Sequence, residues 1–169
     1  MSDYTVVRDW TTKAGFRAVI IMVSKGFHCG YVGLPAGHPL YGCEYGEPCD
    51  ALAFPMGETV GKRGIIPLLC ADGEARPDVV FDVHGSLTYS GSSETYPVPH
   101  DGLWWFGYDC GHSGDGRSDA YIAGMKAAFP NKPFMWFEGD GVFRDLDYCV
   151  AECESLAQQM ADRIKAGAE

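Results

Sequence analysis

The stretch LWWFGYDCGHSGDG, residues 103–116, carries four side chains capable of chemistry directly after a bulky aromatic run. These are Asp109, Cys110, His112 and Asp115, and three glycines follow Cys110. Imidazole titrates near neutral pH and a carboxylate can orient it, so such a set suits general acid and base catalysis or a divalent metal site. The sequence therefore predicts that any chemistry occurs at the end of this segment.

Residues of the same kinds occur earlier in the chain. Asp82 and His84 are two residues apart, and His38 lies in GLPAGHPLYG. Each of the three histidines is next to a glycine, which indicates close approach of backbone or ligand. We predict a pocket for a small polar ligand, with an aromatic wall that stacks on a base or sugar. The predicted ligand-binding residues are His38, Asp82, His84, Ser86, Thr88, Trp105, Asp109, His112 and Asp115.

The spacing of these residues does not decide which of them are catalytic or whether they bind a divalent metal cofactor, because no HExxH or similar motif is present. The glycine-rich loop 111–116 precedes an expected helix, where N–H groups can hold an anion. Its spacing fits neither the Rossmann nor the Walker motif, so an ordinary turn is the simpler interpretation.

Cysteines suggest two further sites, a Cys110 nucleophile activated by His112 and a four-thiolate zinc site. Buried, unreactive thiols are the simpler interpretation of both. The candidate zinc ligands are Cys43, Cys49, Cys149 and Cys153. Seven cysteines without a recognisable signal peptide predict reduced thiols in a cytosol.

The formal net charge is −10, which should repel nucleic-acid backbones and anionic lipid surfaces. No apolar segment approaches the roughly 18 residues needed to cross a bilayer, and the N-terminus does not resemble a signal peptide. We expect a cytosolic protein that binds a small molecule and has no nucleic-acid polymer or membrane partner, and the oligomeric state stays open.

Hydrophobic patterns predict several strands. Residues 17–24 and 27–34 form a hairpin around Lys25 and Gly26, and short strands are expected at 65–70, 103–110 and 133–138. Residues 79–90 show the cleanest alternation in the chain, with apolar side chains on one face and polar ones, including Asp82, His84, Ser86 and Thr88, on the other.

Two helices are expected, one from the cap Ser118 to Ala128 and one after the cap Asp145 with apolar residues at spacings of three and four. We predict one α+β domain over residues 1–169, in which a largely antiparallel sheet carries the C-terminal amphipathic helix on one face. A β-sandwich is the alternative.

Four stretches resemble a family of small uncharacterised proteins of bacteriophages and prophages. They are GYVGLPAGHPLYG, DVHGSLTYS, LWWFGYDCGHSGD and YCVAECESLAQQM. The third is similar to a WWFGFDCAHAGD motif, with Tyr108, Gly111 and Ser113 in place of Phe, Ala and Ala. The resemblance implies a phage accessory protein that acts in the cytosol of the bacterial host, for example in counter-defence, and it implies no reaction.

Two functions follow as hypotheses. In the first, the pocket binds a nucleotide or phosphoester, either to sequester a signalling nucleotide or to hydrolyse it. In the second, the protein inhibits a host factor through its acidic surface. The pocket hypothesis makes a geometric prediction, that the side chains of His84 and His112 lie within about 8 Å on one side of neighbouring strands.

Overall fold

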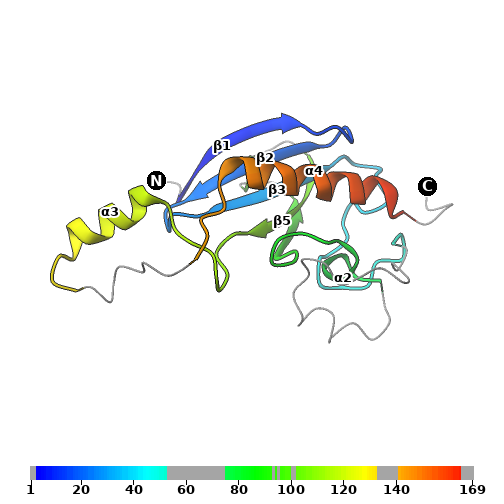
Figure 1. Ribbon diagram of the computed structural model, residues 1–169. Helices are drawn as coiled ribbons and strands as arrows, with labels where there is room; N and C mark the ends of the chain where they lie inside the picture. Colours follow the sequence, from blue (N-terminus) through cyan, green and yellow to red (C-terminus); the bar gives the residue numbers. More distant parts are fainter. Residues whose placement is uncertain are drawn as a thin grey trace.

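The computed structural model describes residues 3–52, 75–92, 94, 96–99, 102–132 and 141–164. Five antiparallel strands form one sheet in the order β1-β2-β3-β5-β4, and helices accompany it (Figure 1). The elements are β1 (Tyr4–Thr11), β2 (Arg17–Val23), β3 (His28–Leu34), α2 (Pro77–Val80), β4 (Tyr89–Ser92), β5 (Trp104–Asp109), α3 (Asp119–Ala128) and α4 (Leu146–Asp162). This is the predicted α+β fold, and the described residues contain one sheet rather than the two of a sandwich.

The hairpin of β2 and β3 forms the centre of the sheet. Both strands are buried along most of their length, which explains why RAVIIMV shows no alternation of apolar and polar residues. The turn between them closes where the N–H of Gly26 donates to the carbonyl of Val23 over 2.9 Å. Gly26 has a φ of 78°, a conformation that favours glycine. The predicted hairpin is confirmed, and so is the strand predicted at 103–110, which corresponds to β5.

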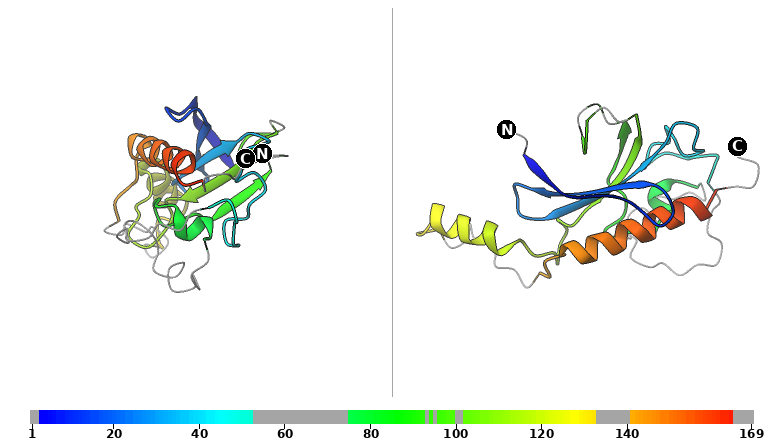
Figure 2. Two further views of the ribbon diagram at one scale, coloured as in Figure 1. Left: turned by 90° about the vertical axis from the view of Figure 1, so that its right-hand side faces the viewer. Right: turned by 90° about the horizontal axis from the view of Figure 1, so that it is seen from above.

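The C-terminal helix α4 lies across one face of the sheet, against β2 and β3 (Figures 1 and 2). As predicted, Asp145 caps it, with the carboxylate accepting from the N–H of Tyr148 over 2.9 Å. Its buried residues are Cys149, Glu152, Cys153, Leu156, Ala157 and Met160. Glu152 does not belong to the apolar pattern, and its burial has a role in the site described below.

The opposite face of the sheet has a smaller core of its own, which contains Tyr4, Phe27, Tyr89 and Tyr96 at its margin. Its buried members are Val19, Ile21, Cys29, Tyr31 and Trp105. Because successive side chains of a strand point to opposite faces, β5 sends Trp105 to this face and Phe106 to the face under α4.

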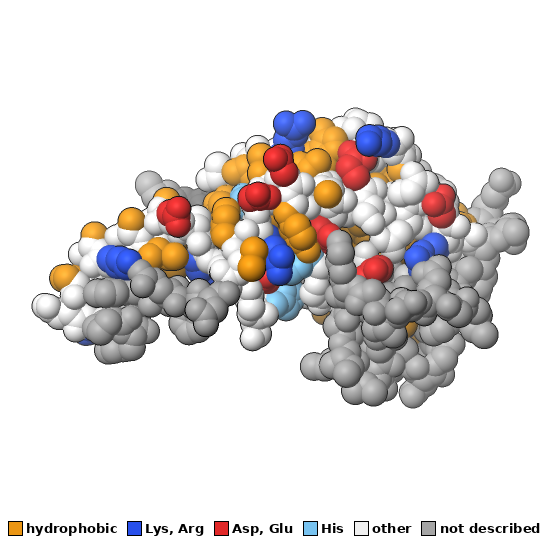
Figure 3. All heavy atoms as spheres, in the orientation of Figure 1, with side chains coloured by type: hydrophobic (Ala, Val, Ile, Leu, Met, Phe, Trp, Pro, Cys, Tyr) orange, Lys and Arg blue, Asp and Glu red, His pale blue; other side chains and the backbone are white. Residues whose placement is uncertain are grey.

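Helix α3 extends away from the sheet and has no buried residue (Figures 1 and 2). Ser118 caps it as predicted, accepting from the N–H of Tyr121 over 3.3 Å. On the face drawn in Figure 3, acidic side chains lie singly or in pairs among basic and neutral ones, without a continuous acidic band over the residues described there.

The segment 79–90 differs from the predicted strand. The alternation correctly identified four buried side chains, since Val79, Phe81, Val83 and Leu87 are at most 2% exposed. The backbone is nevertheless helical in α2, irregular over 81–88 and extended in β4. Pro77 favours a helix start, and the adjacent positive φ angles of 66° at Gly85 and 81° at Ser86 are incompatible with a strand.

Strand β1 was not predicted, because as an exposed edge strand it lacks an apolar face. Val6 and Val7 are 40% and 38% exposed, and the pairing with β2 shifts register between Val6 and Arg8. The strands expected at 65–70 and 133–138 lie outside the described residues.

A glycine seam between β3 and β5 should be essential for stability. A Cβ atom at Gly107 would lie 2.4 Å from the ring of Tyr31, whereas one at Gly124 in α3 would meet no atom within 4 Å. We expect Gly107→Ala to lower the free energy of unfolding by about 1–3 kcal/mol. Gly124→Ala, the control, should raise it by up to about 1 kcal/mol, because alanine favours helix. Urea denaturation measures both, and equal effects would contradict this packing.

Candidate functional site

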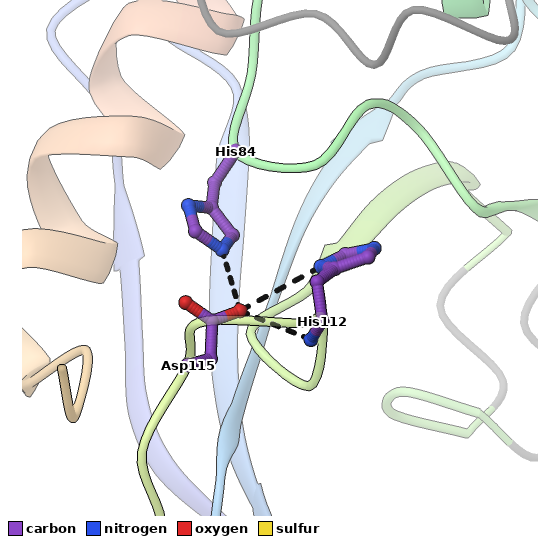
Figure 4. Close-up of side chains that lie close together, drawn as sticks. All are labelled: His84, His112 and Asp115. Carbon is purple, nitrogen blue, oxygen red and sulfur yellow. Dashed lines mark hydrogen bonds and ion pairs between the residues drawn. The ribbon is translucent and has the colours of Figure 1, made fainter. Parts of the chain in front are cut away.

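His84 and His112 lie together at one end of the sheet, with Asp115 between them (Figure 4). The two imidazole centroids are 5.7 Å apart. His84 Nε2 lies 2.9 Å from Asp115 Oδ2, and His112 Nδ1 lies 3.7 Å from the same oxygen. The predicted proximity of the two histidines is confirmed, although His84 comes from an irregular segment and not from a strand.

Helix α4 holds the backbone that carries His84. As in a strand, alternate residues of this segment make backbone hydrogen bonds, but their partners are polar side chains of α4 and of its C-cap residue Arg163. Arg163 Nη1 donates to the Val80 carbonyl over 2.8 Å, Gln159 bonds both the N–H and the carbonyl of Asp82 over 2.8 Å, and Glu152 Oε2 accepts from the N–H of His84 over 2.8 Å. Hydrogen bonds with the buried Glu152 and the partly buried Gln159 therefore fix the position of the backbone at His84.

Gly85 allows the two imidazoles to approach. Its φ is 66°, and a Cβ atom there would lie 2.2 Å from Cε1 of His112. Any larger residue would displace the His112 ring, so the glycine beside His84 has the close-approach role expected from the sequence.

Asp115 is the most buried member of the cluster, with a side chain 2% exposed. Besides His84, it accepts from the N–H of His112 over 3.0 Å and from Nε of Arg144 over 3.0 Å. Burial alone would raise the pKa of Asp115, but the hydrogen bonds from His84 and Arg144 outweigh it and lower the pKa below its ordinary value. Asp115 is therefore an anion at neutral pH.

The second ring nitrogen of His84 is also engaged. Its Nδ1 lies 3.0 Å from the hydroxyl of Tyr148, in the first turn of α4, and the guanidinium of Arg144 lies over the Tyr148 ring at 5.0 Å. Burial, followed by the charge of Glu152, raises the pKa of Tyr148 to about 12. A neutral tyrosine thus orients the imidazole that faces Asp115.

The ring of His112 is less well satisfied than that of His84. Its Nδ1 is buried and has no hydrogen-bond partner within the part of the chain that the structure describes. The atom lies 3.8 Å from Oδ1 of Asp109 and 3.7 Å from Oδ2 of Asp115. An unsatisfied buried nitrogen costs about 1–3 kcal/mol, so this atom requires a partner that the described side chains do not supply.

A pocket of about 510 Å³ opens beside the cluster. Arg117 stacks on the ring of Phe27 at 4.6 Å, and its Nη1 has no acceptor among the described residues. A cationic group and an unsatisfied imidazole thus lie at the same hollow. The residues lining this pocket are Gly111, His112, Ser113, Gly114, Asp115, Arg117 and Tyr121.

The structure does not bring His38 and Trp105 to the cluster. His38 follows the far end of β3, where its ring packs against Phe16 at 5.2 Å and accepts from the N–H of Leu40 over 3.2 Å. Trp105 is fully buried in the core of the opposite sheet face and has no surface to offer a ligand.

The remaining predicted residues are divided between two places. Ser86 is 3% exposed and donates to the carbonyl of Asp78 over 2.9 Å, which removes it from the expected polar row. Asp82 anchors the segment before His84 through its backbone. Thr88 donates to Asp109 over 3.2 Å on the other side of the strand end. Asp109 therefore borders the cluster.

Three neighbours of the cluster were missed in the sequence, namely Arg144, Tyr148 and Glu152, which contact it from around and within α4. The spacing of Tyr148 and Glu152, one helical turn apart, was available as a signal. Their partners, however, lie 64 and 68 residues away in the chain, and a helical pattern does not reveal such contacts.

The cysteine alternatives are not supported. Cys43 and Cys49 form a disulfide, so the expectation of reduced thiols is wrong for this pair, and they are not free to bind zinc. Cys110 is 1% exposed, and a hydrogen bond with Cys149, together with burial, raises its pKa far above the ordinary value. A nucleophilic Cys110 is therefore excluded by its surroundings.

Comparison of the chain with protein-family models, curated proteins and solved structures found no match. Within the described ranges, no helix combines the length and the apolar composition required to cross a membrane.

Removal of the Asp115 carboxylate should be far more damaging than removal of Asp109. Asp115→Ala leaves His84 and Arg144 without their shared anion, and we expect a loss of about 3 kcal/mol in the free energy of unfolding. The matched control Asp109→Ala removes a carboxylate that is 33% exposed and should cost about 1 kcal/mol. Chemical denaturation at pH 7 provides both values, and a cost of Asp115→Ala no greater than that of Asp109→Ala would refute this assignment.

Proposed function

We propose that the protein is a metal-dependent phosphoester hydrolase in which His84 Nε2, His112 Nδ1 and the Asp115 carboxylate bind one divalent transition metal. The observation that carries the proposal is the buried Nδ1 of His112, which lacks a partner among the described residues. The three donor atoms lie within 4.8 Å of one another, close enough to share an ion.

The donor types favour zinc or a similar ion. Two imidazoles and one carboxylate are typical of catalytic zinc sites with an open position, and the same set also binds manganese or ferrous iron. Outer partners are in place as well, since Tyr148 contacts the remaining nitrogen of His84 and Arg144 contacts the remaining oxygen of Asp115. Metal binding would displace the proton between His84 and Asp115.

The pocket beside the cluster supports an anionic ester as substrate. A divalent metal held by His84, His112 and Asp115 would lower the pKa of a bound water to near neutrality and so supply the nucleophile. Attack on phosphorus would break the ester P–O bond, and the leaving alcohol would take up a proton from solvent. Arg117, on the wall of the same pocket, is placed to neutralise the phosphate, which the net charge of the chain would otherwise repel.

Two related functions have less support. Sequestration of a nucleotide by a phage protein would use the same pocket without turnover, and the open metal position favours turnover. Inhibition of a host factor through an acidic surface would require aligned acids, whereas the face in Figure 3 intersperses them with bases.

Metal content provides the first test. We expect protein purified without chelators to contain about one zinc, manganese or iron ion per chain by elemental analysis. His84→Ala and His112→Ala should each lower metal affinity at least about 100-fold, because each removes a ligand. His38→Ala, a histidine at the far end of β3, is the control and should bind as wild type. Metal-free protein that also fails to bind added zinc would refute the proposal.

Hydrolysis provides the second. With zinc or manganese, the protein should release nitrophenol from p-nitrophenyl phosphate or bis(p-nitrophenyl) phosphate, and EDTA should stop the reaction. Arg117→Gln should lower kcat/KM by roughly 10- to 100-fold without loss of metal, since it removes a charged hydrogen bond to phosphate. Arg8→Gln in the edge strand is the control. Metal binding without turnover of any ester would support sequestration instead.

A further inference from the structure

A second pocket, of about 490 Å³, lies on the sheet face opposite α4. Its walls include five aromatic residues that belong to the smaller core, and polar groups from Ser24, Lys25 and Thr88 also line it. We call it the tyrosine pocket. The residues that line it are Asp3, Tyr4, Val23, Ser24, Lys25, Phe27, Cys29, Tyr31, Thr88, Tyr89, Tyr96 and Asp109.

The tyrosines of this pocket hold one another in place. Tyr96 packs nearly perpendicular to Tyr4 and Tyr31, with ring centroids 5.0 and 5.2 Å apart, and Tyr31 meets Tyr89 at 5.6 Å. Their hydroxyls bond within the protein: Tyr31 to Tyr96, Tyr4 to the carbonyl of Pro97, and Tyr89 to the carbonyl of Tyr96. The rings are therefore fixed by bonds within the protein, and Tyr4, Tyr89 and Tyr96 remain partly exposed at the pocket.

These side chains are uncharged at neutral pH. Burial raises the pKa of Tyr96 to about 12 and raises those of Tyr31 and Tyr89 as well. The pocket consequently offers neutral aromatic rings, surrounded by hydroxyl, amine and carboxylate groups that can bond the edge of a heterocycle.

Two residues, Asp109 and Phe27, lie between this pocket and the cluster of His84, His112 and Asp115. Asp109, the last residue of β5, lines the tyrosine pocket, and its Oδ1 lies 3.8 Å from Nδ1 of His112. Phe27 also lines the tyrosine pocket, and its ring carries the guanidinium of Arg117, which lines the other pocket. The two pockets therefore adjoin at the end of β5.

We propose that the substrate is a nucleotide, with its base in the tyrosine pocket and its phosphate at the metal cluster. The inference rests on the proposed hydrolase function and adds the substrate class. An aromatic base extends the edge-to-face packing of the tyrosines, and such stacking is tolerant of base identity. The stacking role that Trp105 cannot fulfil, because it is buried, belongs to Tyr89 and its neighbours.

The test compares two phosphate monoesters that differ only in the base, adenosine 5′-monophosphate and ribose 5-phosphate, with the zinc-loaded protein. We expect kcat/KM for the nucleotide to be higher by about 10- to 100-fold, mainly through KM, because one stacked base contributes that much binding. Tyr89→Leu should reduce this preference about tenfold, whereas Tyr89→Phe should retain it. Tyr45→Leu, an exposed tyrosine outside the pocket, is the control and should retain it as well.

Binding of adenosine to metal-free wild-type protein, followed by NMR, separates this inference from the hydrolase proposal. Adenosine that shifts resonances of the tyrosine pocket, without turnover of any phosphoester, would uphold the base site and overturn the hydrolase. Equal kcat/KM for the two monoesters and no adenosine binding would overturn the base site and leave the hydrolase intact. Faster turnover of phosphocholine than of the nucleotide would also overturn it, in favour of an organic cation.

Discussion

The site depends on how α4 binds the backbone of residues 80–84. Glu152 and Gln159 supply to this segment the hydrogen bonds that a neighbouring strand would otherwise supply, and they are positioned by a helix whose apolar side chains are buried against the sheet. Burial of those apolar side chains stabilises the helix and thereby the position of His84. Tyr148, from the same helix, then sets the orientation of the imidazole. One packed element thus determines both the place and the direction of a side chain on an irregular segment.

The end of β5 distributes its residues between two faces of the sheet, and this alternation explains why the two pockets are neighbours. Cys110 is buried under α4, while Asp109 faces the tyrosine pocket and His112 lies beyond both, in the loop that returns to Asp115. The charges of the cluster are balanced locally, because Arg144 and His84 share the carboxylate of Asp115. Two buried nitrogen atoms, His112 Nδ1 and Arg117 Nη1, lack hydrogen-bond partners among the described residues, and both residues line the same pocket.

The sequence predicted the parts of this arrangement that depend on local patterns. The central hairpin, the strand ending at Asp109 and both capped helices follow from hydrophobic runs and capping residues, and the burial of Val79, Phe81 and Val83 follows from alternation. Alternation alone could not reveal that helix side chains replace a partner strand. The meeting of His84 with His112 was predicted from their residue types, but Tyr148 and Arg144 were not, since their contacts depend on tertiary packing. His38 was predicted in the same way because it is a histidine beside a glycine, but it lies beyond the opposite end of β3 and does not join the cluster.

Anomalous X-ray scattering from a zinc-soaked crystal would show whether the His84–His112–Asp115 cluster binds a metal. We expect one strong peak within about 2.0–2.2 Å of His84 Nε2, His112 Nδ1 and an oxygen of Asp115, with a water or substrate oxygen in the fourth position. Tyr148 and Arg144 should keep their contacts with the outer atoms of these ligands. A crystal in which zinc is absent from the cluster, and His84 remains hydrogen-bonded to Asp115 in the presence of saturating zinc, would contradict the proposed metal site.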